Sequence, residues 1–149
     1  PPMFRPFIIT LLLSFAASVH AQVINIDNAE LARLSASGAA VIDIRTAPEW
    51  KETGVIVGSK LLTFFDEKGQ SDPTHWLGQL KSLTKPGQPV ILICRSGNRS
   101  RTVAQFMWQQ AGYKTVYNVT SGINVWSREG RPVVPSNSPL VTCAAGKGC

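Results

Sequence analysis

The chain has 149 residues, of which 44% are hydrophobic and 16% are charged, and this composition excludes a disordered or fibrous protein. Its length predicts one compact domain rather than a multidomain enzyme. The formal net charge of +6 is spread along the chain, and no basic stretch is interleaved with aromatic residues, so the sequence does not predict nucleic-acid binding.

Residues 1–21 have the pattern of a cleavable signal peptide. Residues 3–5 give a short basic start, residues 7–17 are apolar, and Val-His-Ala at 19–21 resembles the small-residue exit before a cleavage point. The apolar stretch is shorter than the roughly 20 residues of a membrane-spanning helix. We therefore expect a periplasmic or secreted protein without a stable membrane anchor after cleavage; an uncleaved anchor is the alternative. Pro1 and Pro2 are interpreted as non-native or upstream residues.

Behind the leader, short apolar runs alternate with helical segments, which predicts an α/β fold with a mainly parallel sheet. The run 90–93 is apolar without alternation, as in a strand that is covered on both faces. We therefore expect an open sheet flanked by helices on both faces, within a domain of residues 22–135. Strands are expected at 23–26, 41–44, 60–62, 90–93 and 115–119. Helical segments are expected at 27–38, with a capping box of Asp27 and Glu30, and at 48–52, 72–85 and 98–112.

Directly after the buried strand, Cys94 opens a short loop that leads into a helix. Such a loop directs backbone N–H groups and the positive helix end toward a common centre, which makes a cradle for an anion. Thiol chemistry requires the thiolate, which neighbouring cations and a helix N-terminus favour. The loop brings in Arg95, Arg99 and Arg101, and Gly97 lets its backbone turn. Cys94 is therefore the candidate nucleophile, and residues 95–100 are candidate substrate-binding residues.

Each of these residues also has a purely structural interpretation. A lone cysteine at a strand end is often a small buried apolar residue, and Arg101 can equally lie on the outer face of the helix. Ser96 and Ser100 can donate hydroxyl groups to the loop or the substrate, or serve as ordinary loop and N-cap residues. The clustering of arginines and a glycine beside Cys94 favours a functional site.

The stretch Cys94-Arg95-Ser96-Gly97-Asn98-Arg99-Ser100 resembles the active-site loop of the rhodanese, or sulfurtransferase, family. Residues 41–50 and 122–132 resemble the family's early strand with its acidic-aromatic turn and its closing helix. The sequence departs from the family at Val55, where a histidine is usual, and at Ser121, where a glycine is usual. The resemblance runs from about residue 25 to 135 and implies a rhodanese-like fold.

The resemblance implies two displacements at sulfur. Thiolate Cys94 attacks the sulfane sulfur of a small anionic donor such as thiosulfate, sulfite leaves, and a persulfide remains until cyanide or a thiol, including a protein thiol, takes the sulfur. The N–H groups of residues 95–100 would hold the terminal sulfur, while Arg95 or Arg99 would attract the donor and support the leaving sulfite. This mechanism needs no metal or organic cofactor. His75 is the sole histidine behind the leader, so a multi-histidine metal site or a Ser-His-Asp triad is not expected.

Two other functions remain as alternatives. Cysteine phosphatases and some arsenate reductases also place a thiolate in an anion-binding loop, but they would need an arginine six positions after the cysteine, where this chain has Ser100 and where Arg99 comes one residue too early. A rhodanese-like module could instead recognise a partner without turnover. The presence of Cys94 argues against that module.

Outside the loop, Asp43 and Arg45 flank a strand end, and we expect them to organise loops by hydrogen bonding. Asn118 begins a glycosylation acceptor pattern to which we assign no function. Residues 136–149 are rich in Pro, Ser, Ala and Gly and predict a flexible tail. Cys143 and Cys149 in this tail can close a disulfide that contributes at most about 2 kcal/mol. Alternatively, one of them receives sulfur from Cys94 or protects it.

Overall fold

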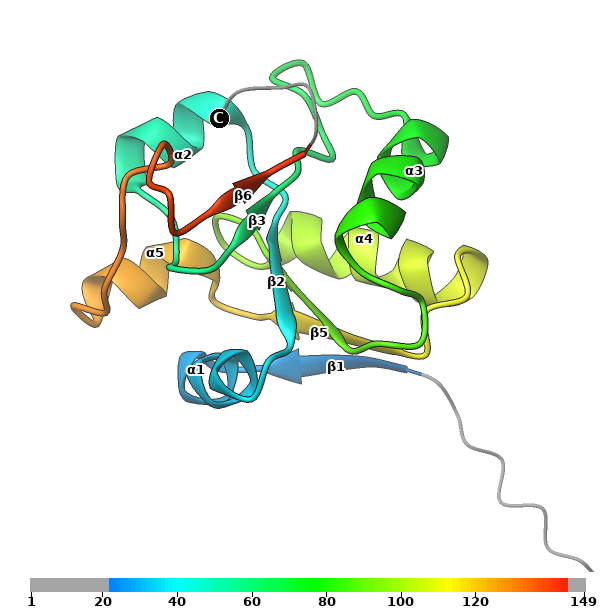
Figure 1. Ribbon diagram of the computed structural model, residues 1–149, viewed down its shortest axis with the longest axis horizontal. Helices are drawn as coiled ribbons and strands as arrows, with labels where there is room; N and C mark the ends of the chain where they lie inside the picture. Colours follow the sequence, from blue (N-terminus) through cyan, green and yellow to red (C-terminus); the bar gives the residue numbers. More distant parts are fainter. Residues whose placement is uncertain (1–21, 145–149) are drawn as a thin grey trace, which may run out of the picture.

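The computed structural model describes residues 22–144, whereas the predicted signal peptide and Cys149 lie outside the described residues. The described chain forms an open sheet in which all paired strands are parallel. Its strands are β1 (Gln22–Ile26), β2 (Ala40–Asp43), β3 (Lys60–Leu61), β4 (Val90–Ile93), β5 (Thr115–Val119) and β6 (Thr142–Cys143). They lie in the order β1-β5-β4-β2-β3-β6 (Figure 1).

Five helices connect the strands of the described chain: α1 (Asn28–Ala36), α2 (Ala47–Thr53), α3 (Pro73–Leu83), α4 (Asn98–Gln110) and α5 (Gly122–Arg128). Side-chain caps begin two of them as the sequence predicts, because Asp27 accepts from the N–H of Glu30 and Asp72 accepts from the N–H of His75. The capping box expected at Asp27 is wrong in its second half, since the Glu30 carboxylate binds Arg33 instead. Within residues 22–144, no helix is long and apolar enough to cross a membrane.

Helices cover both faces of the sheet, which confirms the predicted fold class. Along β4, Val90 and Leu92 join the core beneath α3 and α4, whereas Ile91 and Ile93 join the core beneath α1 and α5. All four side chains are fully buried. Alternate residues of a strand point to opposite faces, so a continuous apolar run is what a doubly covered strand requires.

Part of the segment after residue 135 adds an edge strand to the sheet, β6 (Thr142–Cys143), which the sequence analysis did not predict. β6 pairs with β3 in parallel, with Lys60 opposite Thr142 and Leu61 opposite Cys143. The N–H of Gly58 also donates to the carbonyl of Leu140 at 2.8 Å. A strand of two residues is too short to show a periodic pattern, so only its pairing with β3 reveals it.

The topology places a crevice at the carboxyl ends of β2 and β4. These two strands are neighbours, but β2 continues toward β3 on one side and β4 continues toward β5 on the other. Chain connections that diverge in this way leave the loops above the strands free to hold a ligand. The loops that begin at Ile44 and Cys94 lie side by side at this point, because Asp43 and Ile93 are paired at the ends of the two strands.

Candidate active site at the carboxyl ends of β2 and β4

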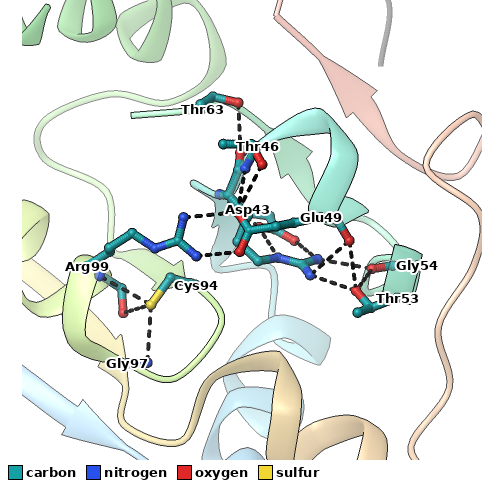
Figure 2. A network of polar contacts seen from close by, with 11 residues as sticks. Asp43, Thr46, Glu49, Thr53, Gly54, Thr63, Cys94, Gly97 and Arg99 are labelled. Carbon is teal, nitrogen blue, oxygen red and sulfur yellow. Dashed lines mark hydrogen bonds and ion pairs between the residues drawn. The ribbon is translucent and has the colours of Figure 1, made fainter. Parts of the chain in front are cut away.

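Cys94 follows β4 directly, and its Sγ atom is the centre of a set of polar contacts (Figure 2). The N–H groups of Gly97 and Ser100 donate to Sγ at N···S distances of 3.1 and 3.4 Å. The Ser100 hydroxyl oxygen lies 3.2 Å from the same sulfur. Cys94 is a free cysteine whose exposed fraction is 1%. The loop therefore wraps around the sulfur and offers it two backbone hydrogen-bond donors.

Two glycines let the loop take this shape. Gly97 has φ +94°, and a Cβ there would overlap the carbonyl oxygen of Thr120. Gly122 has φ +61°, and a Cβ there would overlap the carbonyl group of Arg95. Larger residues fit neither position, because the backbone is in the left-handed region and the β5–α5 connection presses against the loop.

The start of α5 fixes the loop from the other side. The N–H groups of Ile123 and Asn124 donate to the carbonyl oxygens of Cys94 and Arg95 at 2.9 and 3.2 Å. The first N–H groups of a helix have no partner within the helix, so the loop satisfies them. Ser121, where the family usually has glycine, has φ −101° and needs no glycine, whereas the next residue, Gly122, does. Sequence reasoning missed this role of Gly122.

A chain of hydrogen-bonded amide and hydroxyl groups leads from the residue beside the sulfur, Ser100, through Asn118 to Asn25 on β1. The Ser100 hydroxyl donates to Asn118 Oδ1 at 2.6 Å, and Asn118 Nδ2 donates to Asn25 Oδ1 at 3.0 Å. Ser100 and Asn118 are fully buried, so these bonds satisfy groups that water does not reach. They tie α4 to β5 and β1. Asn118 is thus a positioning residue that the sequence analysis missed. A polar residue in an otherwise buried strand was the signal that could have indicated it. Because Asn118 is fully buried, it has no room for a glycan.

Arg99 is held by a carboxylate fifty positions earlier in the chain. Its two terminal nitrogens donate to the two Glu49 oxygens at 2.9 and 2.5 Å (Figure 2). Glu49 also accepts from the N–H and the hydroxyl of Thr46, both at 3.0 Å. Burial would raise the pKa of Glu49, but the hydrogen bonds from Arg99 and Thr46 and the charge of Arg99 lower it to about 2. The Glu49 hydrogen bond likewise raises the pKa of Arg99.

Asp43 and Arg45 form a second ion pair at the end of β2, and both side chains are 1% exposed. Arg45 donates to the two Asp43 oxygens at 2.9 and 2.6 Å. The same guanidinium donates to the hydroxyl of Thr53 at 2.7 Å and to the carbonyl of Gly54 at 3.0 Å. It therefore joins the end of β2 to the end of α2, and within residues 22–144 neither Asp43 nor Arg45 has a hydrogen bond to Cys94.

The remaining predicted loop residues surround a cavity rather than the sulfur. Arg95, Ser96 and Asn98 are exposed and line a cavity of about 870 Å³. Its other walls are the start of α2 (residues 46–49) and residues 65–69. The structure thus places Gly97 and Ser100 on the sulfur, Arg99 on Glu49, and Arg95, Ser96 and Asn98 on the cavity wall.

Val55, where the family usually has histidine, lies away from this cavity. It is fully buried, packs with Trp50 and Leu61, and exchanges two backbone hydrogen bonds with Val134. Within residues 22–144, no group of three or more His, Cys, Asp or Glu side chains could hold a metal ion. Cys143 takes part in a disulfide, while Cys149 lies beyond the described residues.

Comparison with known proteins identifies the family. The model of the rhodanese-like domain matches residues 27–129, which is more than half of the chain. The protein belongs to the rhodanese-like domain family. Among rhodanese-like proteins, rhodanese-like domain-containing protein 17 of Arabidopsis thaliana is 30% identical to it over 123 residues, which cover 80% of this chain and 78% of that protein. A sulfurtransferase of Allochromatium vinosum is 33% identical over 94 residues, which cover 63% of this chain and 77% of that protein.

A solved structure shares the rhodanese-like fold. The polysulfide-sulfur transferase homodimer of Wolinella succinogenes superimposes with a TM-score of 0.59 over 78% of this chain and 81% of that chain, at 22% identity. Identity at this level shows the fold alone. The strand β6 lies outside the residues that the family model matches.

Proposed function

We propose that this rhodanese-like protein is a sulfurtransferase that carries a sulfane sulfur on Cys94 as a persulfide. The observation that carries the proposal is the convergence of two backbone N–H groups, from Gly97 and Ser100, on the sulfur of a free cysteine. Donors that are fixed in place before reaction stabilise negative charge without reorganisation. The same donors suit a thiolate and the terminal sulfur of a persulfide, which are the two states in the cycle.

The first displacement loads the enzyme. The Cys94 thiolate attacks the outer sulfur of thiosulfate, a new S–S bond forms, the S–S bond of thiosulfate breaks, and sulfite leaves with the bonding electron pair. Arg95 is the cation that can attract the dianion, because Arg99 is engaged by Glu49, whereas Arg95 lines the cavity and has no carboxylate partner in the described chain. In the second displacement, cyanide or a thiolate takes the outer sulfur and Cys94 leaves as a thiolate.

The burial of Cys94 favours a second candidate, a binding module without turnover. Neither a donor nor an acceptor can reach a sulfur that stays 1% exposed, so catalysis requires the loop to open. The phosphatase alternative has less support. Ser100 occupies the position that such enzymes give to an arginine, and its hydroxyl is engaged by Asn118.

Incubation with thiosulfate and cyanide, beside a phenyl phosphate ester, separates the three candidates. We expect thiocyanate release, no phosphate release, and a mass increase of one sulfur atom on the peptide that contains Cys94 when cyanide is omitted. Cys94→Ser should abolish thiocyanate formation while its thermal transition stays close to that of the parent. Arg101→Gln is the matched control, because Arg101 is an exposed residue of α4 that does not line the cavity.

Each other outcome would overturn the proposal. Sulfur transfer retained by Cys94→Ser would show that Cys94 is not the nucleophile. Phosphate release would favour a phosphatase. A protein that takes up no sulfur and releases no thiocyanate would be the binding module.

We also propose that residues 1–21 direct export to a periplasmic or extracellular space. The support is the signal-like pattern of these residues. The intact mass of the protein recovered from a periplasmic or culture fraction tests this: a mature chain beginning at Gln22 is expected, and a full-length cytoplasmic chain would contradict it.

A further inference from the structure

The cavity beside the Cys94 loop is large enough for an organic molecule. Its volume of about 870 Å³ lies within the roughly 300–1,000 Å³ of pockets that bind organic ligands, whereas thiosulfate has only five heavy atoms. Cyanide is smaller still. The cavity therefore suits a reactant larger than either, and with thiosulfate as the donor of the proposed function that reactant is a thiol acceptor.

The charged groups on the cavity walls are of two kinds. Three are occupied by contacts within the protein: Glu49 and Arg99 bind one another, and Asp66 Oδ1 accepts from the N–H groups of Lys68 and Gln70 at 2.9 and 2.8 Å, which closes its own turn. The other two, Glu67 and Arg95, have no such contact within the described chain.

Glu67 and Arg95 are exposed and line the cavity from two separate segments, residues 65–69 and the Cys94 loop. Among residues 22–144, neither side chain has a hydrogen bond or an ion pair, and they do not pair with one another. The five charged wall residues together carry one more negative than positive charge. A wall of this kind attracts an ammonium group at Glu67 and a carboxylate at Arg95.

We infer that the acceptor is a small zwitterionic thiol of the cysteine type, whose ammonium group faces Glu67 and whose carboxylate faces Arg95, an inference that rests on the proposed sulfurtransferase function. Glu67 is then a specificity-determining residue. The acceptor thiol gives its proton to solvent, and its thiolate attacks the outer sulfur of the Cys94 persulfide. One S–S bond forms on the acceptor as the S–S bond to Cys94 breaks, so no oxidant or reductant is consumed.

A panel of acceptors that differ in charge tests the inference. Persulfide-loaded protein is mixed with L-cysteine, cysteamine, 3-mercaptopropionate or 2-mercaptoethanol, and sulfur transfer is measured for the parent and for Glu67→Gln. We expect Glu67→Gln to lower kcat/KM for L-cysteine and cysteamine roughly fivefold relative to 2-mercaptoethanol, which corresponds to about 1 kcal/mol. Glu52→Gln is the matched control, because Glu52 is an exposed carboxylate on α2 away from the cavity.

The panel compares each acceptor between variants, so the intrinsic reactivities of the thiols cancel. A second measurement needs no transfer chemistry. Calorimetry compares the binding of L-cysteine to Cys94→Ser and to the double variant with Cys94→Ser and Glu67→Gln. Adding Glu67→Gln should weaken the binding of L-cysteine roughly fivefold. Equal acceptor ratios in the parent and Glu67→Gln, or equal affinities in the calorimeter, would overturn the inference. Glu67-dependent binding without any sulfur transfer would instead overturn the proposed function and leave the ligand class standing.

Discussion

Two ion pairs lie at the carboxyl ends of β2 and β4, and they differ mainly in burial. Asp43 and Arg45 are each 1% exposed, whereas Arg99 and Glu49 are 30% and 22% exposed. Both pairs have two-pronged hydrogen bonds from a guanidinium to a carboxylate. The first fastens strand to helix inside the protein, and the second stands on the wall of the cavity. The same type of ion pair is thus structural where water is excluded, and it is part of a surface that can face a ligand where water reaches it.

The physical reason is the cost of an unpaired charge. Removing one partner of a buried pair leaves a charge that water cannot solvate, which costs about 3–5 kcal/mol. Near the surface, water solvates the remaining partner, and a pair contributes about 0–1 kcal/mol. Substitutions in the two pairs should therefore act on different properties of the protein.

The largest effect is expected from Arg45→Met. This substitution leaves the Asp43 carboxylate buried and unpaired, so the free energy of unfolding in urea should fall by about 3–5 kcal/mol. Replacing both members, with Asp43→Leu and Arg45→Met, should recover part of the loss, because no buried charge remains. A fall in unfolding free energy of less than about 1 kcal/mol for Arg45→Met alone would show that burial does not make the Asp43–Arg45 pair more important for stability than the Arg99–Glu49 pair.

Glu49→Gln should change stability less and substrate binding more. We expect a loss of about 1 kcal/mol or less and a KM for thiosulfate that falls about twofold to fivefold, because the substitution removes a negative charge from the cavity wall and frees Arg99 for an anion. Steady-state thiocyanate formation measures the KM. An unchanged or higher KM would mean that Arg99 does not become available to the donor.

A pH series of urea unfolding sharpens the contrast further. The pKa of Glu49 is about 2 in the folded protein against 4.5 as its ordinary value, so its ionised form contributes stability above pH 4.5 that is lost as the pH falls from 4.5 toward 2. The difference in unfolding free energy between the parent and Glu49→Gln should therefore shrink over this range. A constant difference would contradict the lowered pKa.

The smallest effect is expected from Arg33→Gln. Arg33 and Glu30 form a third pair, in which the side chains are 65% and 39% exposed. Water reaches both groups, so the midpoint of urea unfolding should not differ measurably from that of the parent. A clear shift would show that exposure alone does not rank these pairs.

Features that depend on a few neighbouring residues were predictable from the sequence. The apolar run 90–93 indicated a strand covered on both faces, and Asp27 and Asp72 indicated the starts of α1 and α3. The strand β6 was missed, because its two residues form a strand only beside β3. Local patterns report burial and caps, but they do not report which distant strand supplies hydrogen bonds.

The site shows the same division. A cysteine after a buried strand, followed by a glycine and a helix, indicated where a sulfur and its N–H donors would meet. Arg95 or Arg99 was expected to attract the donor, and the structure pairs Arg99 with Glu49, a residue of another helix. The roles of Asn118 and Gly122 were also missed, because each depends on contact with the Cys94 loop from β5 or α5.

The sequence by itself determined the alternation of strands and helices, the doubly covered central strand, and the cysteine loop with a glycine at its turn, because side-chain burial and backbone freedom are properties of short segments. Only the tertiary structure decided which arginine is paired, which amide supports Ser100, and which two unpaired charges face one cavity. Those outcomes depend on the order of strands in the sheet, which brings together residues far apart in the chain.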